Sequence, residues 1–169
     1  MKNSAKVRIA ILAASAISLA PGTTRADKPL TVTVARLTLG TALKMARGAI
    51  SACRHKGFQV TATVVDRNGI TQVVLRDTIA APLSLAISYD KAYTSAMFNA
   101  KGTVMQKETR HAPLSYAGAH LLFVGGSIPI EAGGVFYGAI GVSGTPSAQT
   151  DEDCAAAGLK TVHQALEMQ

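Results

Sequence analysis

The sequence predicts an α+β domain in which antiparallel strands form a sheet and helices cover it. Segments with helical and strand patterns follow one another in the order helix, hairpin, helix, hairpin, helix. Strands that are adjacent along the chain pair as antiparallel hairpins, whereas a parallel doubly wound sheet would place a helix between successive strands. The absence of tryptophan and an aromatic content of 5% also fit a compact domain rich in small aliphatic residues.

The first 26 residues are expected to be a secretory signal. Lys2, Lys6 and Arg8 precede an apolar run over residues 9–20, and small residues lead to a predicted cleavage site after Ala26. The apolar run is shorter than the roughly 20 residues that a spanning helix needs. We therefore expect a periplasmic or secreted protein with no stable membrane insertion after signal removal.

Loss of the signal also changes the charge. Removing residues 1–26 from the 169-residue chain leaves 143 residues, enough for one domain with its own core. The four basic side chains that leave with the signal, the three above and Arg25, lower the net charge from +7 to +3. The remaining basic residues form neither a stripe nor a pattern interleaved with aromatic residues, so no nucleic-acid partner is expected.

A leader over residues 27–36 precedes the domain, which is expected to span residues 37–169. Thr38 is a suitable N-cap for a helix over residues 39–56, and Gly57 is a suitable stop. At helical spacing the apolar side chains share one face, which we expect to be buried. The opposite, largely cationic face carries Lys44, Arg47, Ser51, Arg54 and His55.

A hairpin and a second helix are expected next. Residues 58–77 contain two β-rich runs on either side of Asn68-Gly69, a pair that predicts a type I′ turn because both residues accept positive φ angles. Pro82 opens a helix that runs to about residue 100. Its apolar residues are spread around the axis, so we expect it to pack on the sheet and partly against another subunit.

The segment over residues 101–120 is polar and contains Pro113 and Gly118. This composition predicts an irregular region that a ligand could approach. Two or three strands should follow, over residues 121–124, 128–130 and 135–142. A last helix is predicted from Asp151 to about residue 167.

The glycine-rich stretch over residues 138–158 does not match a catalytic motif. A nucleophile turn needs G-x-S-x-G, but Gly144 follows Ser143 directly. Neither glycine pattern of a phosphate loop is present. We interpret the stretch as a strand, a glycine turn and a helix start capped by Thr150 with Asp153, and we assign no catalytic residue.

The two cysteines leave an alternative open. Cys53 and Cys154 are 101 positions apart, and in an oxidising compartment they could form a disulfide or remain two small buried thiols. A C-x-x-C pair is absent, which disfavours a dithiol redox site and a cysteine-based zinc site.

Four blocks of the sequence carry a family resemblance. They are GGSIPIEAGGVFYGAIGVSG from residue 125, DEDCAAAGL from residue 151, VVDRNGITQVVLRD from residue 64 and DKAYTSAMF from residue 90. Together they resemble the GlcG/HbpS family of haem-binding proteins, whose domain also occurs at the C-terminus of PduO-type corrinoid adenosyltransferases. The resemblance implies a profilin-like α+β fold, with a five-stranded antiparallel sheet flanked by helices, and assembly into a homo-oligomer.

The resemblance also implies a bound haem or related tetrapyrrole and a role as carrier, scavenger or sensor accessory. Haem needs an axial donor, an apolar slot and cations for its propionates. His55 is the leading candidate for the iron ligand, with Arg47 and Arg54 beside it for the propionates, since the related PduO domain is thought to take its axial histidine from this part of the fold. The alternative for this helix face is a solvated surface.

Further haem-binding candidates are His111, Tyr116 and His120, which occupy the polar segment before the second set of strands. The alternative for these three residues is a polar surface loop. His163, on the last helix, is expected to serve packing or to face solvent.

Two other classes of function stay open. One is a small enzyme that acts on an organic acid or metabolite, with Asp66, Arg76 or Glu131 in a subunit cleft. The other is a ligand-free assembly module that uses the wide apolar face of the second helix.

Overall fold

The computed structural model describes residues 29–110 and 120–169 of the chain. Every helix and strand of the described residues lies in one unit of the chain, Val34–Gln169, which is the second of two units. In chain order its elements are α1 (Leu39–His55), β1 (Thr61–Asp66), β2 (Thr71–Arg76), α2 (Ser84–Phe98), α3 (Gly102–Thr109), β3 (Ser127–Ala132), β4 (Val135–Ser143) and α4 (Ala148–Glu167).

One antiparallel sheet forms the centre of the second unit. Its strand order is β2-β1-β4-β3, with every neighbouring pair antiparallel. The α+β class is therefore confirmed, but the described residues contain four strands where five were expected. The profilin-like assignment stays a prediction.

The expected strand over residues 121–124 is absent because its backbone groups bond elsewhere. The N–H of Leu122 donates to the side-chain oxygen of Thr94 on α2 at 2.7 Å. The N–H of Val124 donates to the carbonyl of Leu122 at 2.9 Å. A segment whose donors are used in this way cannot extend the sheet ladder.

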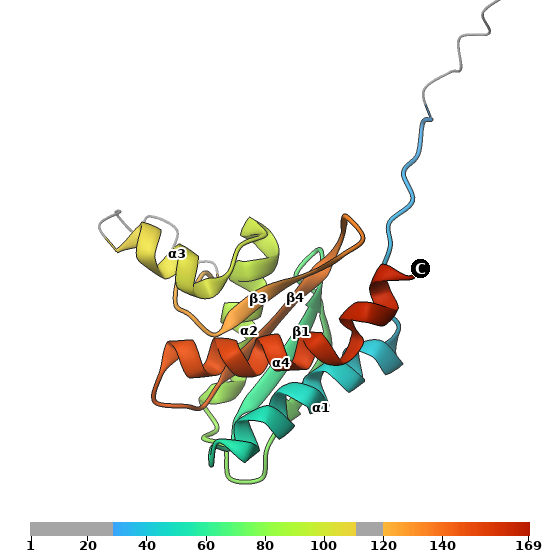
Figure 1. Ribbon diagram of the computed structural model, residues 1–169. Helices are drawn as coiled ribbons and strands as arrows, with labels where there is room; N and C mark the ends of the chain where they lie inside the picture. Colours follow the sequence, from blue (N-terminus) through green and yellow to red (C-terminus); the bar gives the residue numbers. More distant parts are fainter. Residues whose placement is uncertain (1–28, 111–119) are drawn as a thin grey trace, which may run out of the picture. The chain divides into compact units, whose positions relative to one another are not determined.

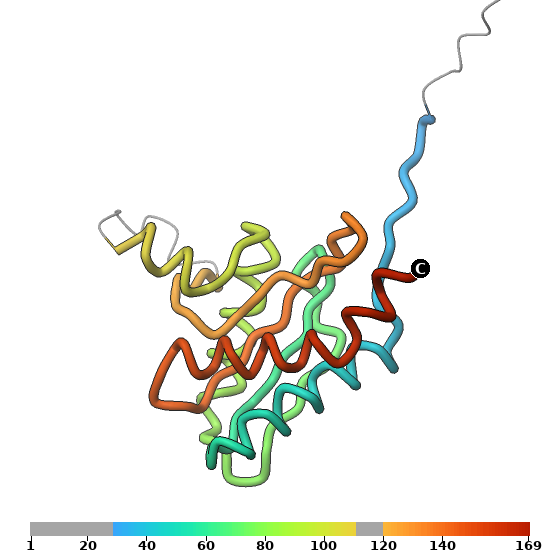
Figure 2. The backbone as a smooth tube through the Cα atoms, viewed as in Figure 1, coloured from blue at the N-terminus to red at the C-terminus, as the bar shows by residue number. Residues whose placement is uncertain are grey.

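Helices cover both faces of the sheet. α1 and α4 lie side by side on one face, and α2 lies on the other (Figures 1 and 2). The main hydrophobic core fills the space between the sheet and the α1–α4 pair, with Met45, Ile130, Ile140 and Val142 among its fully or almost fully buried side chains. The expectation that α2 packs on the sheet is confirmed.

α2 approaches the sheet unusually closely. Gly141 of β4 lies so near the backbone of Ser88 and Ala92 that an added Cβ would collide with both. Small and hydroxyl-bearing side chains line much of the interface, with Tyr89 and Phe136 packed at the apolar cluster of Val65, Ala92, Ala96 and Ala139. The hydroxyls of Thr63 and Ser88 lie 2.7 Å apart, and those of Thr61 and Ser84 lie 2.6 Å apart.

The prediction for α1 is confirmed at both ends. The N–H of Thr41 donates to the hydroxyl of the N-cap Thr38 at 3.3 Å, and Gly57 leaves the helix with a φ of +81°. Most of the predicted apolar face is buried, whereas Leu39 is exposed because it is the first helical residue.

The hairpin forms as predicted, but its turn is not the predicted type I′. Asp66 accepts the N–H of Gly69 through its carbonyl, and its own N–H donates to the carbonyl of Ile70, so the loop has three residues rather than two. Gly69 has a φ of +77°, whereas Asn68 does not adopt a positive φ, as a type I′ turn would require. The Asp66 carboxylate favours this loop by accepting the N–H groups of Asn68 and Ile70.

The region predicted as irregular contains helix α3. A carboxylate from α4 stabilises its first turn, where Glu152 accepts the N–H of Thr103 at 2.8 Å and the Thr103 hydroxyl at 2.6 Å. Such a carboxylate satisfies a donor that a helix N-terminus leaves free. His111 and Tyr116 lie outside the described residues.

α4 begins three residues before its predicted start. Ser147, not Thr150, is the N-cap, and its hydroxyl accepts the N–H of Thr150 at 3.4 Å. The predicted capping box is wrong because the carboxylates of this turn bond elsewhere. Asp151 and Glu152 are buried against other elements, and Asp153 faces Lys56 of α1 at 3.3 Å.

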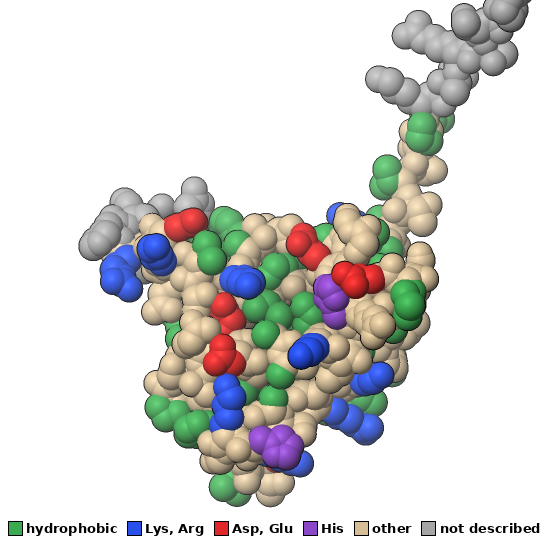
Figure 3. All heavy atoms as spheres, in the orientation of Figure 1, with side chains coloured by type: hydrophobic (Ala, Val, Ile, Leu, Met, Phe, Trp, Pro, Cys, Tyr) green, Lys and Arg blue, Asp and Glu red, His purple; other side chains and the backbone are tan. Residues whose placement is uncertain are grey.

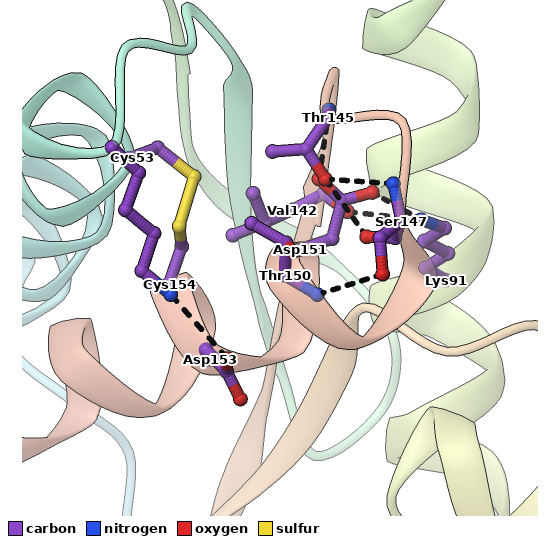
Figure 4. The surroundings of a disulfide bond; sticks show 10 residues. Cys53, Lys91, Val142, Thr145, Ser147, Thr150, Asp151, Asp153 and Cys154 are labelled. Carbon is purple, nitrogen blue, oxygen red and sulfur yellow. Dashed lines mark hydrogen bonds and ion pairs between the residues drawn. A yellow bond between two sulfur atoms is a disulfide. The ribbon is translucent and has the colours of Figure 1, made fainter.

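Cys53 and Cys154 are joined by a disulfide that links α1 to α4 (Figure 4). Their Cα atoms are 5.6 Å apart, and both side chains are fully buried. The structure therefore selects the disulfide over two free thiols.

Candidate functional site

Two hollows in the described surface are candidate ligand sites. The first, which we call the arginine groove, has a volume of about 410 Å³ and lies between α1 and β2. It is lined by Arg47, Ile50, Ser51, Arg54, Leu75, Arg76 and Asp77. The structure thus brings together Arg47 and Arg54, the two predicted propionate partners, and adds Arg76.

One of these arginines already has a carboxylate partner. Arg54 donates from Nε and Nη2 to the two carboxylate oxygens of Asp77, each at 2.6 Å. These hydrogen bonds hold the pKa of Asp77 below its usual range against the opposing effect of burial, and they raise the pKa of Arg54. Arg47 is also exposed but forms no ion pair with a described carboxylate, so it is more available than Arg54 to an anionic ligand.

His55 does not line the arginine groove. It is exposed in the last turn of α1, between the cationic residues Arg54 and Lys56. Its side chain has no hydrogen-bond partner among the residues that the structure describes. The predicted combination of His55 with two propionate-binding arginines is therefore not assembled in one hollow.

The second hollow, which we call the 121–124 trough, has a volume of about 450 Å³. Four consecutive apolar residues form one wall, and the last turns of α3 form the other. The lining residues are Gln106, Thr109, Arg110, Leu121, Leu122, Phe123 and Val124. Phe123 packs edge-on against Phe98 at a centroid separation of 5.3 Å, so the apolar wall continues toward the end of α2.

His120 lies immediately before this wall. Its Nδ1 is 3.1 Å from a carboxylate oxygen of Asp90 on α2, and its ring meets the edge of Tyr89 at a centroid separation of 5.7 Å. Its side chain is 70% exposed. A histidine of this kind is oriented by the protein and can still bind a ligand.

The three residues considered for an enzyme are not gathered in one place. In the register of β1, Arg76 pairs with Thr61 at one end, whereas Asp66 lies at the other end. Asp66 forms an ion pair with Arg36 at 2.8 Å, and Glu131 accepts a hydrogen bond from Asn99 at 2.6 Å. Within one protomer the described residues therefore provide no acid–base pair from this set.

Sequence reasoning missed a buried cluster, which we call the polar junction. Lys91 of α2 donates to Asp151 of α4 at 2.8 Å and to the carbonyl of Val142 at 3.2 Å (Figure 4). The other carboxylate oxygen of Asp151 accepts the N–H of Thr145 at 3.1 Å. The Lys91 and Asp151 side chains are only 5% and 4% exposed, so the junction joins elements from both faces of the sheet without offering a surface for ligands.

Charges of both signs are interspersed on the face where α1 and α4 lie (Figure 3). Lys, Arg, Asp and Glu side chains thus alternate on this face rather than gathering by sign. Among residues 29–110 and 120–169, no three His, Cys, Asp or Glu side chains form a group that could hold a metal ion. The same ranges contain no helix long and apolar enough to cross a membrane.

Comparison with known families decides the assignment. The model of the family described as "Haem degrading protein HbpS-like" matches residues 37–160. The chain belongs to the HbpS-like family. The resemblance found in the sequence is thereby confirmed, and the match includes α1, the whole sheet and the first part of α4.

Relatives of this HbpS-like chain include an uncharacterized 15.0 kDa protein of Citrobacter freundii. It is 32% identical over 117 residues, which cover 66% of this chain and 82% of the relative. A crystal structure of HbpS is 37% identical with a TM-score of 0.75, covering 79% of this chain and 94% of the other.

Two further crystal structures extend the comparison. A double mutant of HbpS from Streptomyces reticuli is 35% identical with a TM-score of 0.74, covering 89% of this chain and 98% of the other. A structure named as a PduOC–haem complex is 20% identical with a TM-score of 0.69, covering 75% of this chain and 95% of the other. At that identity the last comparison shows a shared fold and nothing more.

Proposed function

We propose that this HbpS-like protein binds haem. The observation that carries the proposal is the 121–124 trough, which combines an apolar wall with a cation and adjoins an oriented histidine. The family description refers to haem, which supports the same ligand class.

The residues present fit the chemical requirements of haem. A macrocycle needs an apolar surface, which Leu121, Leu122 and Phe123 provide, and its propionates need a cation, which Arg110 provides. His120 supplies an imidazole next to this surface. When bound, haem would contribute an iron centre that takes small ligands and changes oxidation state.

The arginine groove suits haem less well. None of its lining residues is a histidine, and its apolar part consists of Ile50 and Leu75. Besides Arg54, which is paired with Asp77, the groove contains Arg47 and Arg76. These two arginines favour a second candidate function, the binding of a small organic acid. A tricarboxylate titrated against the protein would test this candidate, with Arg47→Ala expected to weaken binding.

We also propose that the protein is exported and acts as a haem carrier, scavenger or sensor accessory. The Cys53–Cys154 disulfide supports export, because structural disulfides persist in oxidising compartments.

Homo-oligomer formation is proposed through the outer face of α2. That face is unusually apolar, with Leu83 63%, Leu85 42% and Met97 40% exposed.

Titration of the processed protein with hemin tests the proposed function. We expect a Soret shift that saturates at a fixed stoichiometry per chain. Leu121→Glu should weaken binding, because it places a negative charge in the apolar wall of the trough, whereas Leu39→Glu at the start of α1, where Leu39 is 66% exposed, serves as the control. The proposal fails if hemin produces no saturable shift. It also fails if both variants bind hemin with the same affinity as the unchanged protein.

A further inference from the structure

We infer that His120 is the residue that coordinates the haem iron, through Nε2, and that Asp90 is the residue that positions its ring. This inference rests on the proposed haem binding and deepens it. It departs from the sequence-based expectation, in which His55 was the leading iron ligand.

The hydrogen bond between His120 and Asp90 determines which nitrogen is available. Nδ1 of His120 lies 3.1 Å from the Asp90 carboxylate, which can only accept a hydrogen bond when ionised. The proton of the neutral ring is therefore held on Nδ1, and the lone pair is on Nε2. Metal-binding histidines have this arrangement, in which a carboxylate fixes the tautomer and increases the basicity of the ligating nitrogen.

The backbone fixes where this ring stands. His120 has a φ of +61°, one of two positive values among the described non-glycine residues. Two residues further on, the N–H of Leu122 is held by Thr94 of α2, one helical turn from Asp90. α2 thus anchors both the histidine side chain and the chain that follows it. A positive φ is uncommon for residues other than glycine, and such conformations cluster at functional sites when the surrounding structure holds them.

The other described histidines lack part of this arrangement. His55 has cationic neighbours and no carboxylate partner within the described ranges. His163 lies 3.5 Å from Glu167, but this is a pair within one helix with both side chains about half exposed. The apolar residues next to it in sequence or one turn away, Val162 and Leu166, are buried in the main core.

The environment of His120 also matches an apolar ligand. Tyr89 contacts the ring, and the trough wall starts at the next residue. Phe98 of α2 packs on Phe123 of the trough and is 49% exposed, so the apolar surface extends beyond the trough. A planar iron complex requires exposed apolar surface next to an imidazole whose orientation is fixed.

Hemin-loaded variants test the inference by spectroscopy. His120→Asn is the main variant, because asparagine tolerates the positive φ and can still bond to Asp90. We expect the absorption and EPR signatures of histidine ligation to be lost, hemin affinity to fall at least tenfold, and added imidazole to restore the histidine-type spectrum. His55→Asn is the matched control and should keep the spectrum of the unchanged protein. Circular dichroism and melting curves would establish that both variants are folded.

Asp90→Asn tests the positioning role. The change keeps an acceptor for Nδ1 and removes the charge, so we expect the iron to remain histidine-ligated while affinity falls about 10- to 100-fold and the iron reduction potential rises. A structural role alone would not move the potential. An unchanged potential and affinity would overturn the assignment of Asp90.

The outcomes separate this inference from the proposed function. If the unchanged protein does not bind hemin, the proposed function fails. If it binds hemin and His120→Asn keeps the full histidine signature, the assignment of His120 is overturned while haem binding stands. In that case His111→Ala and Tyr116→Phe would identify the ligand instead.

Discussion

Replacing Lys91 with methionine should destabilise the fold strongly. The ammonium group neutralises Asp151 at 2.8 Å in a site where both side chains are about 95% buried, and it also donates to the Val142 carbonyl. Methionine keeps most of the side-chain volume but leaves a carboxylate without its counter-charge and a carbonyl without its donor. Removing one partner of a buried ion pair costs about 3–5 kcal/mol.

Urea unfolding of the oxidised protein measures this loss, with Lys160→Met as the control because Lys160 is exposed on α4. Adding Asp151→Asn to Lys91→Met removes the orphan charge and keeps an acceptor for Thr145, so the double variant should lose less than the two single losses combined. The difference is the coupling free energy, expected to be about 1–3 kcal/mol. If Lys91→Met costs no more than the control, the reasoning about the polar junction is wrong.

Three other perturbations have predicted outcomes. Replacing Cys53 and Cys154 with alanine should lower the free energy of unfolding by about 4–5 kcal/mol, because the disulfide closes a loop of roughly 100 residues, and thermal melting with and without reductant measures this loss. Since the pKa of Asp77 is lowered in the folded state, its contribution to stability is present above its unfolded pKa and is lost as pH falls through the folded value. Asp77→Asn should therefore flatten the acid limb of a stability–pH curve, whereas equal acid limbs would contradict the Arg54–Asp77 assignment. Gly141→Ala should cost about 1–3 kcal/mol by forcing α2 away from β4, as measured by urea unfolding, and a neutral effect would show that the contact is loose.

The sequence predicted those elements whose signals are local. The cap at Thr38 and the stop at Gly57 lie within a turn of the helix they bound, and both are observed. The hairpin at Asn68-Gly69 also formed, although the Asp66 side chain changed its turn type. Such features depend on neighbours a few positions away, which the sequence displays directly.

Features that depend on distant partners were not predictable in this way. α3 has no capping side chain of its own, and the carboxylate that stabilises it is 49 positions away in Glu152. The buried face of α2 carries Ser84, Ser88, Lys91 and Ser95 at helical spacing, a pattern typical of a solvent-exposed face. Besides backbone carbonyls near the serines, the sheet hydroxyls and Asp151, supplied by other elements, make that polar face suitable for burial.

The candidate site shows the same division. Arg47 and Arg54 are two turns apart on α1, and they line one groove as expected. His55 follows Arg54 directly, which places it about 100° further around the helix axis and out of the groove. The approach of His120 to Asp90 joins positions 30 residues apart, and no periodicity within either segment predicts it.

The covalent link between Cys53 and Cys154 makes a closed ring of most of the domain, including the whole sheet, α2 and α3. A protease that cuts one peptide bond anywhere inside this ring leaves two pieces still joined through sulfur. Such a nicked molecule would migrate as a single species until reductant is added, so gels run without reductant would not detect the damage.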